Sequence, residues 1–265
     1  MMDYAPLRPV AAEALNRATR IIGSRIPGAV TLKSDRDLVT DVDLAVEDEL
    51  REFLTAETPE IGFLGEENGH TGPKDRWWVL DPVDGTSNLA HGIPLCGVSL
   101  GLVDGDRGVL AAIELPFLGA RYTAVEGGGA FAGDQPIRIA DVDRMSDAVL
   151  SVGDFATGEG AEPKNRVRLG LLARLGARAH RIRMLGSAAI DLAWVADGKL
   201  AGTVILANFP WDTAAGVLLV REAGGLVFDR DGSDHTVDSA ATIAVGPALH
   251  AELLELLRQA ELDLD

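Results

Sequence analysis

The sequence predicts a mixed α/β (α+β) fold, and three patterns along the chain support this class. Apolar residues near the N-terminus recur at helical spacing, the middle of the chain carries short apolar runs between turn residues, and the second half alternates such runs with helical patterns. With 265 residues, the chain is long enough for two closely packed lobes. We expect an α+β lobe over residues 1–140 and an α/β lobe over residues 141–265.

The elements follow from these patterns in order. A helix is expected from Leu7 to about Ile26, where a proline and a glycine end it, and a second helix follows Asp41. Strands are expected over residues 61–64, 77–80, 97–103, 108–115 and 121–125, and further on over 149–152, 181–184, 202–206 and 242–245. Between the strands expected at 149–152 and 181–184, residues 153–164 read as a polar loop. Helices are expected over residues 187–196 and 211–223 and after Pro247, with Ser187 as an N-cap.

Composition limits the possible partners. The chain has 41 acidic and 24 basic residues, a formal charge of -17, so binding to nucleic acid or to an anionic membrane through a basic surface is not expected. It has one cysteine, Cys96, and no apolar run long enough to span a bilayer. We therefore expect a cytoplasmic protein with no disulfide framework and no membrane helix.

The segment Trp-Trp-Val-Leu-Asp-Pro-Val-Asp-Gly-Thr-Ser-Asn, residues 77–88, carries the strongest chemical signal. A buried strand runs directly into Asp81 and Asp84, whose spacing across a turn can aim both carboxylates into one pocket. Gly85 lets the backbone approach a ligand, and the free amides of Gly85 and Thr86 at a helix start suit a phosphate group. Carboxylates, together with the Val83 carbonyl, are ligands that Mg²⁺ prefers. An isolated pair of this spacing would usually be a capped turn.

Three further acidic residues are candidates for the same site only when they are considered together with this segment, because each has an ordinary explanation alone. Glu66, in Gly-Glu-Glu-Asn, follows a predicted strand, but adjacent glutamates are usually a solvated loop in so acidic a chain. Asp212, in Trp-Asp-Thr-Ala-Ala-Gly, would ordinarily be the N-cap of the next helix. Asp43 would ordinarily be a first-turn residue favoured by the helix dipole.

Taken together, these motifs resemble the inositol monophosphatase family of lithium-sensitive, metal-dependent sugar phosphatases, and most of all its actinobacterial members. Its patterns match Gly-Glu-Glu at residues 65–67, Asp-Pro-Val-Asp-Gly-Thr-x-Asn at 81–88, Trp-Asp-x-Ala-Ala-Gly at 211–216 and Glu-Ala-Gly-Gly at 222–225. The looser Leu-Val-Thr-x-x-Asp matches residues 38–43, and Gly-Ser-Ala-Ala at 186–189 extends the match. The motifs occur in the family's order over most of the chain.

The resemblance implies a layered αβαβ(α) sandwich and hydrolysis of a small phosphate monoester without a covalent intermediate. It implies two or three Mg²⁺ ions, held by Glu66, Asp81, the Val83 carbonyl, Asp84 and Asp212. It implies catalytic roles for Glu66, Thr86 and Asp43, which would activate the attacking water, and substrate contacts from Gly85, Thr86, Ser187, Ala188 and Asp212. Lys33 would lie in a mobile loop that helps to close the site. A homodimer, lithium inhibition and a phosphorylated polyol or sugar substrate are also implied.

One position departs from the resemblance. Inositol-specific relatives place a substrate-binding glutamate seven residues before the aspartate that here is Asp212, and this count reaches Ile205. Either a gap shifts the alignment, Asn208 substitutes, or myo-inositol monophosphate is not the preferred substrate.

Several activities therefore remain open within the same fold. They are inositol phosphate, fructose 1,6-bisphosphate, histidinol phosphate and 3′-phosphoadenosine phosphate hydrolysis. A protein that kept the metal site but acts only by binding a partner is the alternative from another class.

Overall fold

The computed structural model describes residues 3–24, 30–34 and 37–262. In these residues the helices are α1 (Arg8–Ser24), α2 (Asp41–Glu57), α3 (Thr86–Ala90), α4 (Ala161–Arg178), α5 (Ala188–Ala196), α6 (Pro210–Glu222) and α7 (His250–Leu262). The strands of the first part are β1 (Val30–Ser34), β2 (Asp37–Thr40), β3 (Gly62–Gly65), β4 (Gly69–Thr71), β5 (Arg76–Asp84), β6 (Gly97–Asp104), β7 (Arg107–Leu115), β8 (Ala120–Val125), β9 (Ala130–Ala132) and β10 (Gln135–Pro136). The strands of the second part are β11 (Val149–Val152), β12 (Arg181–Arg183), β13 (Gly202–Ile205), β14 (Leu226–Phe228) and β15 (Thr242–Val245).

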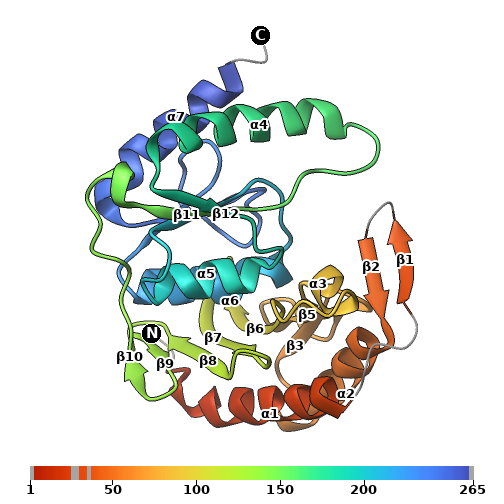
Figure 1. The fold of residues 1–265 in the computed structure, drawn as a ribbon. Helices are drawn as coiled ribbons and strands as arrows, with labels where there is room; N and C mark the ends of the chain where they lie inside the picture. The colour runs from red at the N-terminus through yellow and green to blue at the C-terminus, as the bar shows by residue number, and fades with distance from the viewer. Residues whose placement is uncertain (1–2, 25–29, 35–36, 263–265) are drawn as a thin grey trace.

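The elements stack in five layers (Figure 1). Helices α1 and α2 cover one face of an 8-stranded sheet of order β10-β9-β8-β7-β6-β5-β3-β4, and α5 and α6 cover its other face. The same two helices lie against a 5-stranded sheet of order β12-β11-β13-β15-β14, which α4 and α7 cover from outside. This αβαβα arrangement is the layered sandwich that the resemblance implied.

The first sheet is mainly antiparallel, but β3 and β5 run parallel. Their carboxyl ends therefore lie side by side, and each strand is followed by acidic residues. The ladder continues past the end of β3, because the Glu66 amide donates to the Leu80 carbonyl at 3.2 Å. This pairing brings Glu66 next to Asp81, at the position where the sequence motifs meet.

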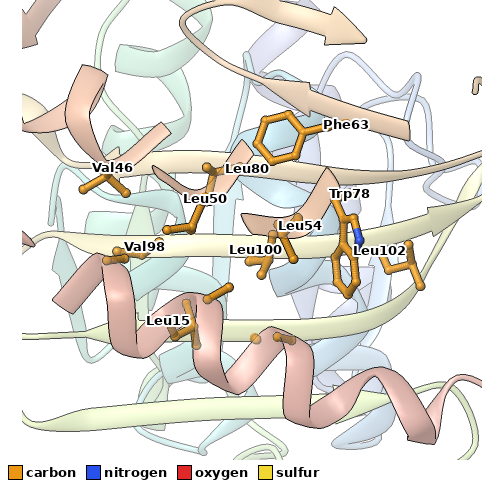
Figure 2. Packing of buried hydrophobic residues seen from close by; sticks show 14 of the residues in the cluster. Leu15, Val46, Leu50, Leu54, Phe63, Trp78, Leu80, Val98, Leu100 and Leu102 are labelled. Carbon is orange, nitrogen blue, oxygen red and sulfur yellow. The ribbon is translucent and has the colours of Figure 1, made fainter. Parts of the chain in front are cut away.

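The core of the first half lies between this sheet and the outer helices (Figure 2). Helix α2 buries Val46, Leu50 and Leu54 at a spacing of four residues, which keeps them on one face. They pack against large side chains of the strands, among them Trp78 of β5, whose indole N–H donates to the Thr58 hydroxyl at 2.9 Å. The packing fixes β5 in its place between β6 and β3.

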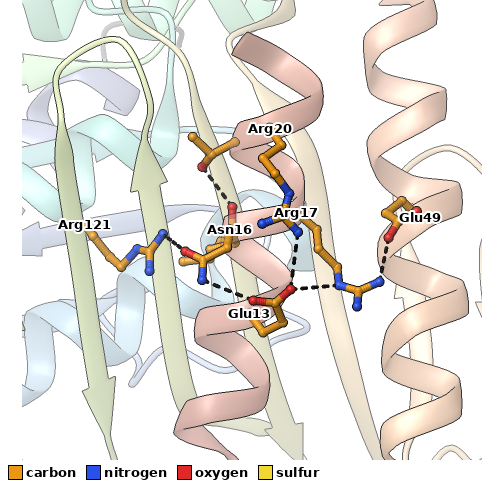
Figure 3. A network of polar contacts seen from close by, with 8 residues as sticks. Glu13, Asn16, Arg17, Arg20, Glu49 and Arg121 are labelled. Carbon is orange, nitrogen blue, oxygen red and sulfur yellow. Dashed lines mark hydrogen bonds and ion pairs between the residues drawn. The ribbon is translucent and has the colours of Figure 1, made fainter. Parts of the chain in front are cut away.

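Helix α1 is tied to its neighbours by a polar network (Figure 3). Glu13 pairs with Arg17 at 3.1 Å, Arg17 pairs with Glu49 of α2 at 2.8 Å, and Arg121 of β8 donates to Asn16 at 2.9 Å. Because such partly exposed pairs each contribute at most about 1 kcal/mol, the network mainly orients the two helices.

The second half has its own core between the 5-stranded sheet and helices α4 and α7. Helices α5 and α6 are apolar almost all round, since they are buried between the two sheets. Their first turns lie near the carboxyl end of β5, since Asp84 contacts the first turn of α5 and Asp212 of α6 lies within electrostatic reach of Asp81.

Most predicted elements are present, and several boundaries differ. Helix α4 begins at Ala161, within the stretch expected to be loop, and β14 was not predicted because its three residues follow two glycines. The stretch that contains Lys33 is a β hairpin of β1 and β2 rather than a loop, although the Lys33 side chain lies outside the described part. The end of the first predicted helix also lies outside it. None of the helices in the described residues combines the length and apolar character needed to cross a membrane.

Candidate active site

Strand β5 delivers two carboxylates to one end of the sheet. Asp81 and Asp84 are 3% and 8% exposed, and the Asp81 carboxylate accepts the amide of Val83 at 3.0 Å, which turns the chain between them. Gly85 follows with φ +94°, and a Cβ there would lie 2.8 Å from the Leu95 carbonyl oxygen. Only glycine fits both the left-handed backbone and this close approach, so the turn into α3 depends on it.

The start of α3 meets the start of α2. The Thr86 hydroxyl lies 2.9 Å from the Asp43 carboxylate and equally 2.9 Å from the Val83 carbonyl, so it can donate to either. Asp43 also accepts the amide of Thr40 at 3.0 Å and the Thr40 hydroxyl, which completes the capping box of α2. Burial raises the pKa of Asp43, against the hydrogen bonds from Thr40 and Thr86 that lower it. The fold thus brings Asp43 and Thr86, which belong to two separate sequence motifs, into contact.

A buried glutamate that the motifs did not single out anchors the Glu66 loop. Glu47 of α2 is fully buried, and its carboxylate accepts the amides of Glu67 at 2.7 Å and Asn68 at 2.9 Å. Arg51 pairs with it at 2.7 Å. A Cβ at Gly65 would lie 2.3 Å from that carboxylate, so glycine is needed to let it reach the loop. The buried Glu47 carboxylate therefore holds the loop that carries Glu66 in place through its backbone amides.

Asp84 connects the first sheet to helix α5. Its carboxylate accepts the Ser187 hydroxyl at 2.8 Å, the Ala188 amide at 3.3 Å and the amide of Ala189. Ser187 is also the N-cap of α5, as predicted, and accepts the amide of Ile190 at 3.2 Å. A carboxylate at a helix N-terminus is stabilised by the free amides and the helix dipole. The first turn of α5 is in this way fixed beside the end of β5.

Asp212 lies in the first turn of α6, but it is not the N-cap that its sequence context suggested. Phe209 is the N-cap, and Asp212 stands three residues later and accepts the Phe209 amide at 2.7 Å. This contact resembles the one that Asp43 makes at the start of α2. Both helices therefore present a first-turn carboxylate toward the same region.

Burial and neighbouring carboxylates raise the pKa of the two aspartates at the end of β5. Burial raises the pKa of Asp81 well above its ordinary value, and the charges of Glu66, Asp84, Asp212 and Asp43 raise it further. Burial raises the pKa of Asp84 to about 6, although its hydrogen bonds with Ala189, Ser187 and Ala188 oppose the rise. Glu66, Asp84, Asp212 and Asp43 therefore all lie within electrostatic reach of Asp81. Their mutual repulsion is the kind of cost that a bound cation offsets.

The donor set fits a hard divalent cation. It consists of carboxylates with the buried Val83 carbonyl, and burial raises the pKa of the nearby Cys96 thiol to about 12, so that this thiol stays protonated. In the part of the chain that the structure describes, no three such side chains are already drawn together closely enough to hold an ion. Asp84 gives one reason, since its carboxylate is turned toward the amides of α5.

A pocket of about 200 Å³ opens beside the carboxylates. Three residues expected to contact the substrate, Ser187, Ala188 and Asp212, line it, together with Asp84, which was expected to bind metal. Gly85 and Thr86, also expected to contact the substrate, are not among its lining residues. Further lining comes from Gly186 of the Gly-Ser-Ala-Ala motif, from Ile205, and from four residues outside the motifs, namely Gly153, Asp154, Asp191 and Ala207.

The surroundings of Ile205 and Asn208 bear on the substrate-binding glutamate that inositol-specific relatives have and this chain lacks at position 205. Ile205 lies in β13 and makes one wall of the pocket apolar. The Asn208 side chain is engaged elsewhere, because it donates to the Ser239 carbonyl at 3.2 Å and accepts the Thr242 hydroxyl at 3.1 Å. The idea that Asn208 replaces the glutamate is therefore not supported, since both ends of its amide already have protein partners.

The family model for the inositol monophosphatase family matches residues 3–262. This match covers nearly the whole chain and includes every motif described above. The chain belongs to the inositol monophosphatase family. The resemblance that the motifs carried is thereby confirmed.

Similar proteins agree with this family. A probable inositol 1-monophosphatase, ImpA of Mycobacterium tuberculosis, is 40% identical over 257 residues, which are 96% of this chain and 94% of the relative. A protein of Thermotoga maritima named fructose-1,6-bisphosphatase/inositol-1-monophosphatase is 32% identical over 228 residues, 84% of each chain. The crystal structure of the extragenic suppressor protein SuhB of Bartonella henselae superposes with a TM-score of 0.89 at 32% identity, covering 96% of this chain and 99% of that one.

Proposed function

We propose that this member of the inositol monophosphatase family is a Mg²⁺-dependent phosphoric monoester hydrolase that acts on a small polyol or sugar phosphate. The observation that carries the proposal is the group of buried carboxylates around the end of β5, next to a pocket lined by the first turns of α5 and α6. An acidic protein can bind a phosphate only where cations or amides offset its charge, and this junction offers helix-start amides and carboxylates that would hold cations.

Glu66, Asp81, the Val83 carbonyl, Asp84 and Asp212 would hold two or three magnesium ions. When bound, the ions would lower the pKa of a coordinated water and neutralise charge on the phosphate. The fit rests on the all-oxygen donor set and on the raised pKa of Asp81, to which burial contributes most and the neighbouring carboxylates add.

Protein groups would bind the phosphate, activate the water and contact the alcohol. The amides of Gly85 and Thr86 would hold the phosphate oxygens at the start of α3. Water attacks phosphorus in line, the bond from phosphorus to the alcohol oxygen breaks, and the alcohol leaves with a proton. Glu66 and the Thr86 hydroxyl, which contacts Asp43 at 2.9 Å, would orient the water and accept its proton. Ser187, Ala188 and Asp212 would contact the alcohol side, and no covalent intermediate is required.

The substrate remains a choice between related esters. Relatives named inositol-1-monophosphatase support inositol phosphates, and the relative with the double name supports a sugar bisphosphate as a second candidate. The apolar wall at Ile205 argues against a site that reads every hydroxyl of an inositol ring. We therefore expect several polyol and sugar phosphates to be hydrolysed.

The test is phosphate release from a panel of esters, namely inositol 1-phosphate, fructose 1,6-bisphosphate, histidinol phosphate and 3′-phosphoadenosine phosphate. Each is assayed with Mg²⁺ and with EDTA, in the wild type and in Asp84→Asn and Asp212→Asn. We expect turnover that needs Mg²⁺ and falls by about 100-fold or more in both variants. Undiminished turnover in both variants, or full activity in EDTA, would refute the proposal.

Four further expectations have their own measurements. Lithium should inhibit turnover in competition with magnesium. Light scattering after size exclusion should give the mass of a homodimer, and fractionation should find the protein in the cytoplasm. Limited proteolysis should cut near residue 141 if the two lobes separate there.

A further inference from the structure

Asp191 lines the pocket from the first turn of α5, one turn beyond Ser187. It is 2% exposed, yet it lines the pocket beside Asp84 and Ile205. The sequence motifs did not single it out, and the proposed mechanism does not use it. A carboxyl group this deeply buried is rare unless it is paired or has a function.

The carboxyl has unused hydrogen-bonding capacity. Its Oδ1 atom is fully buried and has no hydrogen-bond partner among the described residues. The same holds for the hydroxyls of Ser151 in β11 and Thr203 in β13. These two residues are direct partners in the parallel ladder, so their side chains leave the sheet on one face. The Ser151 hydroxyl is close enough to Asp191 to favour its charged form, although the pair does not meet hydrogen-bond geometry.

The other acidic groups of the pocket are already engaged. Asp84 accepts three groups of the first turn of α5, and Asp212 accepts the Phe209 amide. Ile205 lines the pocket with an apolar side chain. Among the buried residues of the lining, polar recognition of an alcohol therefore falls to Asp191, since Asp154 is exposed.

We propose that the Asp191 carboxyl binds a hydroxyl group of the leaving alcohol, and that this contact selects polyol phosphates over phosphates of simple alcohols. The proposal rests on the phosphatase function proposed above and names the residue that reads its alcohol. A hydroxyl that enters the pocket would satisfy the buried carboxyl, whereas an analogue without that hydroxyl would leave it unpaired.

The electrostatic setting supports this role. Burial raises the pKa of Asp191 to about 7, and the charges of Asp84 and Asp154 contribute to the rise. Near neutral pH the group can therefore offer either a proton or a lone pair, and a substrate hydroxyl can meet both.

The experiment compares two matched pairs of esters. These are inositol 1-phosphate with cyclohexyl phosphate, and glycerol 1-phosphate with propyl phosphate. For each we measure kcat/KM with Mg²⁺ in the wild type, in Asp191→Asn, in Asp191→Ala and in the control Asp154→Asn. Thermal unfolding of each variant checks folding, and saturation-transfer NMR measures binding of the free alcohols inositol and glycerol.

We expect the wild type to prefer the polyol member of at least one pair by about 10-fold or more. Asp191→Ala should remove that preference by lowering kcat/KM for the polyol ester alone, and should weaken binding of the free polyol. Asp154→Asn should keep the preference. The inference is overturned if Asp191→Ala lowers kcat/KM equally for both esters of each pair. It is also overturned if Asp154→Asn removes the preference for the polyol ester.

The two proposals fail in different ways. A wild type that releases no phosphate from any ester with Mg²⁺ would overturn the phosphatase function and this inference with it. A wild type that hydrolyses both members of each pair equally well would overturn only the role of Asp191. Asp191→Asn keeps the shape of the side chain, so it tests the carboxyl even if Asp191→Ala is unstable.

Discussion

The Thr86 hydroxyl lies 2.9 Å from the Asp43 carboxylate, although the two residues are 43 positions apart in the sequence. Asp43 is held from its other side by Thr40, so its position does not depend on Thr86. The pair joins the start of α2 to the start of α3, beside Asp81 and Asp84. This relationship leads to the first prediction.

Replacing Asp43 with Asn should lower kcat by about 100-fold or more, with little change in KM, because Asn cannot take up the proton from the attacking water. Thr86→Ala should have a similar effect. Steady-state kinetics of both single variants and of the double variant test whether the two residues act as a unit. The double variant should be no worse than the poorer single one, and Thr86→Ser should keep most activity. Effects that multiply in the double variant would contradict this coupling.

Without metal, removing one buried carboxylate of the site should stabilise the protein. Asp81→Asn removes a charge that Glu66, Asp84 and Asp212 repel. In EDTA we expect Tm to rise by about 2–4 °C, which corresponds to about 1 kcal/mol for a chain of this size. Mg²⁺ should raise the Tm of the wild type and have much less effect on the variant.

The exposed Asp75, which precedes β5, offers the matched control. Asp75→Asn should leave both the Tm in EDTA and the response to Mg²⁺ unchanged within about 0.5 kcal/mol. If Asp81→Asn is less stable than the wild type in EDTA, the carboxylates are not repelling one another.

Glu47 should be far more important for stability than its surface neighbour Glu49 on the same helix. Glu47→Ala would leave the Arg51 charge and the amides of Glu67 and Asn68 without their partner. We expect a loss of about 3–5 kcal/mol in the free energy of unfolding, measured by urea denaturation. Glu49→Ala breaks only a partly exposed pair with Arg17 and should cost at most about 1 kcal/mol.

Glu47→Gln provides a finer test of the Glu66 loop. Gln keeps one acceptor for the loop amides but loses the charge that pairs with Arg51. The affinity for Mg²⁺, measured by calorimetry, should fall more than stability does, because Glu66 is then held less firmly. An unchanged affinity would mean that the loop is positioned without Glu47.

The sequence predicted the parts of this site that are local. The apolar run of β5 predicts a buried strand, and the residues Asp81, Asp84 and Gly85 that follow predict its end and a turn. In the same way, the N-cap at Ser187 follows from its residue type and its place before a helical pattern. The layers followed from the resemblance and from the order of strands and helices. The metal and catalytic roles of the acidic residues stay predictions, although the structure brings those residues together.

The parts that could not be predicted depend on partners distant in the chain. Glu47 is one acidic residue among several on α2, and its burial, its ion pair with Arg51 and its contacts with the amides of Glu67 and Asn68 distinguish it. Asp191 looks like an ordinary first-turn aspartate until β11 and β13 bury it. A helical spacing of four residues from Asp43 to Glu47 was the available signal, since it places both on the buried face of α2.

The last prediction concerns stability in mild acid and His235. Burial, and then the charge of Arg221, lowers the pKa of His235 to about 4, and its ring lies 2.8 Å from the Thr242 hydroxyl. An unfolded histidine has a pKa of about 6.5. Between these values the unfolded chain binds a proton that the folded chain does not. The stability that the neutral ring contributes is therefore present above pH 6.5 and is lost as pH falls toward 4.

The loss should reach about 3 kcal/mol, since one pKa unit corresponds to about 1.4 kcal/mol. His235→Gln keeps an N–H group for Thr242 but cannot titrate, so its stability should decline less over this range. Buried carboxyls such as Asp84, whose pKa is about 6, act in the opposite direction, because the apo protein loses their contribution as pH rises. The difference between wild type and variant, measured by urea denaturation from pH 4 to 7.5, isolates His235. The same substitution at the exposed His180 is the control, and equal profiles for wild type and His235→Gln would refute the assignment.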